Sequence, residues 1–405
     1  MSKINWLLLL TPVFLFSIIS PAQMNTTKEV DLDTVVQIAA QASLKELTQA
    51  IEEVNNRSLY PTYATKDLHW KLASSDDWTS GFWPGTLWYA YELSKDAKFK
   101  QWAIEWTRGI EKQKFNLNTH DLGFRFGCSY GNGLRLAPED TSTRTYKEFM
   151  LAAAATLDKR FFPMIGAFTS NWDKKPLPNS VPVVIDIMMN LELLFWASQN
   201  GGSEQLKEHC LLHANTTCRD FIREDGGSFH IVRYDQTTGK ILNKGQLQGD
   251  VDSSTWSRGH AWMLYGLTTV YRYTKDPQYL SMAIKVADYF INHLPEDNVA
   301  QWDFQSKINI RDASASAIVT SALFELQGYM SDTVKKKYYL NEAKIMLRSL
   351  CLPPYFSNGE KTNCLLLHST QYYHETDNTD VPCTFADYYF LESLVRYKAL
   401  QMKQR

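Results

Sequence analysis

The strongest constraint on the fold is a helical pattern that returns along almost the whole chain. Apolar residues recur at three- and four-residue spacing in segments of roughly 14–22 residues, which is typical of amphipathic helices that bury one face. We predict helices over twelve segments: 32–55, 80–94, 97–115, 122–137, 142–159, 183–199, 203–222, 257–274, 277–293, 312–329, 334–350 and 385–402.

Short turns between these segments indicate how the helices are arranged. Turns such as Ser94-Lys95-Asp96 and Lys275-Asp276-Pro277 favour antiparallel neighbours. Helical hairpins of this kind can close into a ring, so we predict an all-α fold, an (α/α)₆ barrel with six inner and six outer helices. An open solenoid is the alternative, but the segments share no clear repeated sequence. Because no linker divides the chain, we expect residues 23–405 to form a single domain.

The first 22 residues have the pattern of a secretory signal peptide. Lys3 precedes an apolar run from Trp6 to Ile19, and Ser20-Pro21-Ala22 supplies small residues before a cut at Gln23. An uncleaved membrane anchor is the alternative, but the apolar run is short for one. We therefore expect a periplasmic or secreted protein that has no membrane contact after cleavage.

Charge and composition restrict the partners. The formal net charge of −2 provides no basic field for nucleic acid or for a membrane surface. The chain has 12 Trp and 21 Tyr, and an excess of flat rings suggests surfaces on which sugar rings stack. The six Cys match no zinc motif, so we expect buried free thiols, no metal and no cofactor. We expect a monomer or a weak homo-oligomer.

Two longer regions interrupt the helical pattern. Residues 223–250 contain an alternating stretch, Ser228 to Val232, followed by the turn Asp235 to Gly239, which predicts a short hairpin. Residues 351–382 are polar and irregular. Long loops in a compact domain are usually functional, so we expect both regions to lie over one mouth of the barrel.

Two acidic residues are candidates for acid–base chemistry. Asp186 is flanked by apolar residues. If Ser180 is the N-cap, Asp186 lies inside a helix, and Asn190 lies one turn further along on the same face. An isolated buried carboxylate is costly and needs a partner or a task, although a purely structural Asp remains the alternative. Asp121 stands just before a predicted helix and has the alternative of a simple N-cap. If the two lie close together, one of them can hold a proton near neutral pH.

A third candidate group lies near residue 258. Arg258 and Trp262 are spaced i,i+4 in the first turn of a predicted helix, and a guanidinium beside flat rings suits an anionic sugar. A structural Arg stacked on Trp is the alternative. Asp250 and Asp252 lack the rest of a calcium-binding loop. Trp78 precedes a helix near the N-terminus and is placed to stack on a sugar.

Taken together and in this order, several blocks resemble glycoside hydrolase family 88, the unsaturated glucuronyl hydrolases. The resemblance spans about residues 75–395. Each block alone is weak, but their number and their order make the resemblance specific. These blocks are Asp77 to Trp83, His120 to Phe124, Ile185 to Leu191, Ser254 to Trp262, Pro295 to Asp297 with Trp302 to Phe304, Arg311 to Ile318, and Ala386 to Glu392.

The resemblance implies an (α/α)₆ barrel and an unusual reaction. Members of the family hydrate the C4=C5 double bond that a polysaccharide lyase leaves in a terminal uronic acid, and the resulting hemiketal rearranges and releases that sugar. The implied partner is thus an unsaturated uronic-acid oligosaccharide. By resemblance, Asp186 is the acid and base, and Asp121 assists it. The implied substrate-binding residues are Trp78, His230, Gln248, Trp256, Arg258 and Trp262.

The chain departs from the family pattern at three places. Many relatives have Gln in place of His260 and Trp-Gly in place of Phe385-Ala386, and some have Ser-Tyr-His where this chain has Leu366 to His368. We expect these departures near the mouth loops, where they affect substrate preference. Two other functions stay open: an unsaturated rhamnogalacturonyl hydrolase, and a non-catalytic periplasmic protein that binds acidic sugars. A structural helical scaffold does not explain the Trp, Arg and His clusters.

Overall fold

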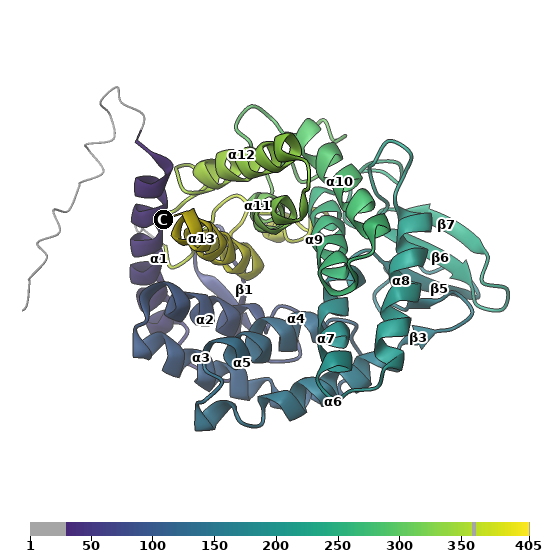
Figure 1. Cartoon of the computed structure of the whole chain (residues 1–405), viewed down its shortest axis with the longest axis horizontal. Coiled ribbons are helices and arrows are strands. Elements are labelled where there is room, and N and C mark those ends of the chain that lie inside the picture. The colour runs from purple at the N-terminus through teal and green to yellow at the C-terminus, as the bar shows by residue number, and fades with distance from the viewer. Residues whose placement is uncertain (1–29, 359–361, 405) are drawn as a thin grey trace, which may run out of the picture.

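The computed structural model describes residues 30–358 and 362–404, and its helices form a closed double ring (Figure 1). The inner ring consists of α2 (Phe82–Ser94), the α4–α5 segment (Leu122–Phe126 and Asn132–Leu136), α7 (Ile187–Gln199), α9 (Ser257–Thr274), α11 (Ala313–Leu326) and α13 (Thr384–Gln404). The outer ring consists of α1 (Leu32–Glu53), α3 (Ala97–Gly109), α6 (Tyr146–Asp158), α8 (Gln205–Phe221), α10 (Pro277–Asn292) and α12 (Thr333–Leu350).

Contacts between the inner helices close the ring. Each inner helix packs against the next one, and the last, α13, packs against the first, α2. The helix α11 is buried along almost its whole length because small residues, Ala313 to Ala317, let its neighbours approach closely. These contacts confirm the predicted (α/α)₆ barrel.

Most predicted helices match the observed ones within a few residues, with two differences that matter. The predicted 122–137 helix is interrupted by a π-helical turn, Gly127–Gly131. The prediction of a helix that begins near Ser180 is wrong, because Ser180–Val184 is strand β5 and α7 begins only at Ile187. Val181, Val183 and Val184 are β-branched, and they pair with a strand that is distant in the sequence.

The strands lie in the segments that connect an outer helix to the inner helix that follows it. The predicted hairpin is confirmed as β6 (Ile231–Asp235) and β7 (Ile241–Gly245), and β5 adds a third antiparallel strand beside β6. Two smaller antiparallel pairs are β1 (Tyr60–Ala64) with β2 (Trp70–Ala73), and β3 (Phe161–Phe162) with β4 (Ala167–Phe168). The short loop from β5 to α7 thereby joins the sheet to the inner ring.

The thiol prediction is confirmed, since all six Cys are free and all but Cys218 are buried. The predicted signal peptide, residues 1–22, lies outside the described residues. Within the described part of the chain, no helix has the length and apolar character needed to cross a membrane.

Candidate active site

A cavity of about 410 Å³ lies where the inner helices begin. Its lining includes seven of the eight residues that the sequence singled out: Trp78, Asp121, Asp186, His230, Gln248, Trp256 and Arg258. The loop before α13 contributes Gln371, Tyr372, Glu375 and Asn378, so part of the irregular 351–382 region lies over this mouth, as predicted. Both candidate carboxylates therefore face one space.

The position of Asp186 in the secondary structure differs from the prediction. It stands at the N-terminal end of α7, just after β5, and its side chain makes no capping hydrogen bond. In the β5–β6 register Val184 pairs with Ile231, and the amide of Ile185 donates to the carbonyl of His230 over 2.9 Å. This pairing brings Nε2 of His230 to 3.3 Å from Oδ2 of Asp186.

Asn190 connects the helices that carry the two acids. Its Oδ1 accepts a hydrogen bond from the amide of Phe124 over 3.0 Å, and its Nδ2 donates to the carbonyl of Asp186 over 3.4 Å. The helices can approach this closely because residue 123 is glycine, where a Cβ atom would lie 2.4 Å from Cα of Asn190. Asn190 thus holds the Asp121 helix against the Asp186 helix.

Asp121 is not a structural N-cap. It occupies the N-cap position of α4, but its carboxylate makes no capping bond. The hydroxyl of Thr119 donates to Oδ2 over 3.3 Å, and Nε2 of His120 lies 3.4 Å from Oδ1. The carboxylate is therefore turned toward the cavity, which it lines together with His120.

The protonation of His230 follows from its neighbours. The backbone amides of Leu247 and Gln248 both donate to Nδ1, each over 3.3 Å, so Nδ1 must carry a lone pair. The ring is then neutral with its proton on Nε2, which lies 3.3 Å from Oδ2 of Asp186 but is not aligned for a hydrogen bond in the free protein. His230 therefore positions and stabilises the Asp186 carboxylate and does not relay protons through its far nitrogen.

Two opposing effects set the pKa of Asp186. Burial raises this pKa, but the neighbouring His230 and His120 side chains lower it by more. The pKa of Asp186 consequently lies below its usual value, and the carboxyl is ionised in the free protein near neutral pH. A proton must reach Asp186 before it can act as an acid.

Arg258 forms part of the cavity wall, but its guanidinium is occupied by the protein. Nη1 donates to Asp312 over 2.6 Å and to the carbonyl of Thr370. Nη2 donates to Gln248 over 3.0 Å and to the carbonyl of Gln371 over 2.6 Å. The prediction of a direct contact to an anionic sugar is thereby weakened, because these bonds use the terminal N–H groups to hold Gln248 and the mouth loop in place.

Aromatic rings frame the cavity. Trp256 lies over the His230 ring with the centroids 4.5 Å apart, and Trp172 lies 5.9 Å from His230 on another element. Trp78 packs against Phe124 and Phe385. The sequence reasoning missed His120, Trp172 and Lys174, although the run Ser170-Asn171-Trp172-Asp173-Lys174 carries a polar and aromatic signal that should have marked it.

Trp262 and His260 both lie outside the cavity lining, and for Trp262 this differs from the prediction. Trp262 lies outside the cavity lining, fully buried against Phe124 and Tyr389, because its position in α9 faces the neighbouring inner helices. His260 is also fully buried and faces outer helix α10, bonded to Ser228 and to the carbonyl of Val286. His260 therefore contacts the 223–250 region through Ser228, as expected, but it does not line the cavity.

We predict that two buried histidines make the folded protein less stable in acid. Burial lowers the pKa of His260 to about 3, and burial does the same for His213. Between pH 6.5 and 3 the unfolded chain binds a proton at each ring and the folded chain does not, so the free energy of unfolding falls as the pH falls. We expect each ring to remove ~2 kcal/mol between pH 7 and pH 5.

Urea unfolding of His260→Gln at these two pH values measures this effect. The glutamine amide can replace both hydrogen bonds, and the variant should lose ~2 kcal/mol less than the wild type on acidification. The matched control is His69→Gln, whose ring is 78% exposed and should leave the pH dependence nearly unchanged. An equal acid loss in His260→Gln and in the wild type would contradict the argument.

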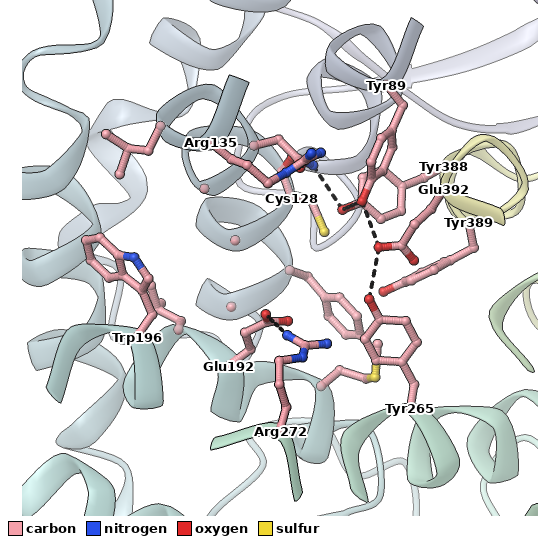
Figure 2. A pocket seen from close by; sticks show the side chains of 18 of the residues that line it. Tyr89, Cys128, Arg135, Glu192, Trp196, Tyr265, Arg272, Tyr388, Tyr389 and Glu392 are labelled. Atoms are coloured by element: carbon pink, nitrogen blue, oxygen red, sulfur yellow. Dashed lines mark hydrogen bonds and ion pairs between the residues drawn. The ribbon is translucent and has the colours of Figure 1, made fainter. Parts of the chain in front are cut away.

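A second cavity, of about 510 Å³, lies at the other end of the inner helices (Figure 2). Most of its charged side chains are paired with one another: Arg272 binds Glu192 and Glu325, and Arg396 binds Glu325 and Glu392. Glu392 also accepts from the hydroxyls of Tyr89 and Tyr265, as the dashed lines in Figure 2 show. Although it is the larger space, it holds none of the candidate acids, which line the first cavity.

No metal site emerges from the described residues, in which no group of three or more His, Cys, Asp or Glu side chains is arranged to hold an ion.

No family model matches the chain. The chain is 42% identical to the unsaturated glucuronyl hydrolase of Formosa agariphila over an alignment of 335 residues. The alignment covers 81% of this chain and 82% of that relative. The chain belongs to the unsaturated glucuronyl hydrolases.

Two further similarities agree with this family. The unsaturated chondroitin disaccharide hydrolase of Streptococcus agalactiae is 32% identical over 372 residues, 89% of this chain and 91% of that protein. The crystal structure of an unsaturated glucuronyl hydrolase specific for heparin superposes with a TM-score of 0.86 at 34% identity, over 91% of this chain and 98% of that one. The chain is thus a glycosidase that releases a 4,5-unsaturated uronic acid from oligosaccharides, as unsaturated glucuronyl hydrolases do. The rhamnogalacturonyl hydrolase and the non-catalytic sugar-binding protein are disfavoured.

Proposed function

We propose that Asp186 is the acid and base of the hydration reaction and that Asp121 assists it in the same cavity. One observation carries this proposal: Asp121, Asp186 and His230 line the same cavity, and Nε2 of His230 lies next to Asp186. Two backbone amides that donate to Nδ1 fix the tautomer of His230. The same cavity is lined by Trp78, Trp172 and Trp256. The rings offer apolar faces to the sugar, and the carboxylates lie where the double bond would be bound.

The chemistry needs one proton and one water. Protonated Asp186 gives its proton to C4, and the π electrons of the C4=C5 bond form the new C4–H bond. Positive charge develops at C5, where a water oxygen attacks while Asp186, now a carboxylate, accepts a proton from that water. The product is a hemiketal at C5, which opens and releases the remaining sugar. His230 keeps the carboxylate oriented through both steps.

The substrates we propose are glycosaminoglycan-derived disaccharides with an unsaturated uronic acid at the non-reducing end. The relatives named for chondroitin and for heparin support this class. At the mouth, Nζ of Lys174 lies 4.1 Å from the ring centroid of Tyr372 and 3.3 Å from Glu375. This lysine is half-exposed, and a sulfate or carboxylate on the second sugar can compete with Glu375 for it.

We also propose that the enzyme works in the periplasm or outside the cell as a monomer or a weak homo-oligomer. The pattern of residues 1–22 supports export. A periplasmic or secreted enzyme would meet oligosaccharides where a lyase releases them.

One assay tests the proposed activity. Unsaturated disaccharides from chondroitin, heparin, hyaluronan, ulvan and pectin are offered separately, and the ultraviolet absorbance of the conjugated alkene is followed. We expect this absorbance to disappear with at least one glycosaminoglycan disaccharide, and to do so equally fast after dialysis against a chelator. Turnover of the pectin product alone would contradict the proposed substrate class, and a loss of activity on chelation would contradict metal-free catalysis.

A further inference from the structure

His120 is a cavity residue to which the reaction scheme above assigns no task. It is almost fully buried, and its two ring nitrogens face different groups. Nδ1 lies 3.2 Å from Oδ1 of Asn171 and 3.4 Å from Oγ of Ser170, whereas Nε2 lies 3.4 Å from Oδ1 of Asp121. These neighbours determine where the ring holds its protons.

The groups beside Nδ1 are both acceptors. Nδ2 of Asn171 donates to the carbonyl of Asn118, which orients the amide so that its oxygen points at His120. The Ser170 hydroxyl uses its proton on the carbonyl of Trp172 and accepts from the amide of the same residue. Nδ1 of His120 must therefore carry a hydrogen, which it donates to Asn171.

With Nδ1 protonated, a neutral His120 ring has a lone pair on Nε2. That lone pair would face the Asp121 carboxylate across 3.4 Å, an arrangement of two acceptors that is repulsive in a buried site. A proton between Nε2 and Oδ1 turns the repulsion into a charge-assisted hydrogen bond. A proton held between Nε2 of His120 and Oδ1 of Asp121 therefore relieves this contact.

We propose that His120 and Asp121 share one proton and pass it to Asp186 when the substrate binds. The inference rests on the proposed function of Asp186, which is ionised in the free protein and lies in the same cavity. Because His120 acts through the two carboxylates, it is a positioning residue. The other charged or titratable groups around the pair are Asp186 just before α7, His230 just before β6, Arg125 on α4 with its neighbours Asp76 and Asp77, and Arg160, whose charge interacts with Asp121.

The proton balance closes over one turnover. The shared proton moves to the Asp186 carboxylate, directly or through one water, and from there to C4. The attacking water gives its hydroxyl to C5 and its proton to Asp186. When the product leaves, that proton returns to the His120–Asp121 pair, so one water is consumed and no other reactant is needed.

The pH dependence of kcat tests this proposal. We expect His120→Gln to lower kcat at least about tenfold with little change in KM, and to move the basic limb of the profile to lower pH. Asn171→Asp places a carboxylate on Nδ1, favours the protonated ring, and should move the same limb up by about one pH unit. His69→Gln, at an exposed site, is the control and should leave the profile unchanged. Unshifted limbs in both cavity variants would overturn the proposal.

A measurement without substrate separates this inference from the proposed function. The ¹⁵N NMR resonances of His120, assigned by comparison with His120→Gln, report which ring nitrogens carry hydrogen. We expect Nδ1 to be protonated and Nε2 to show a partial proton at pH 7. If Nδ1 of His120 carries no hydrogen, the proposal of a shared proton is overturned, even if the enzyme is active. If the pair holds the proton but the protein is inactive, the proposed function is contradicted instead.

Discussion

Asp186→Asn is expected to lose at least about 10³-fold in kcat while the protein stays folded. The amide cannot give a proton to C4 or accept one from water, so both halves of the reaction stop. Its oxygen can still accept the Nε2–H of His230, which lies 3.3 Å from the wild-type carboxylate. The cavity should therefore keep its shape, and KM should change little, because asparagine has almost the same volume as aspartate.

The matched control for this variant is Asp96→Asn. Asp96 caps α3 through a hydrogen bond to the amide of Lys98, and asparagine caps helices about equally well. Both variants remove one carboxylate, so a general charge effect would appear in each. Rates are measured by the loss of alkene absorbance, and folding by circular dichroism and thermal unfolding. Wild-type turnover in Asp186→Asn would remove Asp186 from the reaction.

The helices could be predicted because their pattern is local. Apolar spacing and turn residues lie within each segment, and the ring follows from many short helical hairpins. The start of α7 could not be predicted in this way. Ser180 to Val184 reads equally well as a capped helix start, and only the pairing with Ile231 to Asp235, about 50 residues away, makes it a strand. The position of Asp186 at a helix end follows from that distant pairing.

The candidate site shows the same division between local and distant information. Asp121 and Asp186 were found as unusual acids, but their meeting depends on Asn190 and on the close approach at Gly123. The i,i+4 spacing of Arg258 and Trp262 suggested a common face, yet only Arg258 reaches the cavity, because Trp262 is buried against Phe124 and Tyr389. Sequence spacing specifies which residues share a helix face but not what that face meets.

Arg258→Ala is expected to destabilise the protein by about 3–5 kcal/mol, because it leaves Asp312 buried without its cationic partner. The variant also loses the bonds to the carbonyls of Thr370 and Gln371, which hold the mouth loop, and the bond to Gln248. We therefore expect kcat/KM to fall as well, even though the guanidinium is occupied by the protein. Thermal and urea unfolding measure the first effect, and the alkene assay measures the second.

Four further variants show whether the buried pair causes this loss. Lys100→Ala removes a cation that is 32% exposed and paired with Asp140, which is 23% exposed, and it should cost no more than about 1 kcal/mol. Arg258→Lys keeps the charge but not the fork of donors, so it should recover part of the stability and less of the activity. Adding Asp312→Asn to Arg258→Ala removes the unpaired charge and still caps α11, so the double variant should be more stable than Arg258→Ala alone. If the double variant is instead less stable by the sum of the losses in Arg258→Ala and in a separate Asp312→Asn variant, Arg258 and Asp312 act independently, and the unpaired charge does not cause the loss.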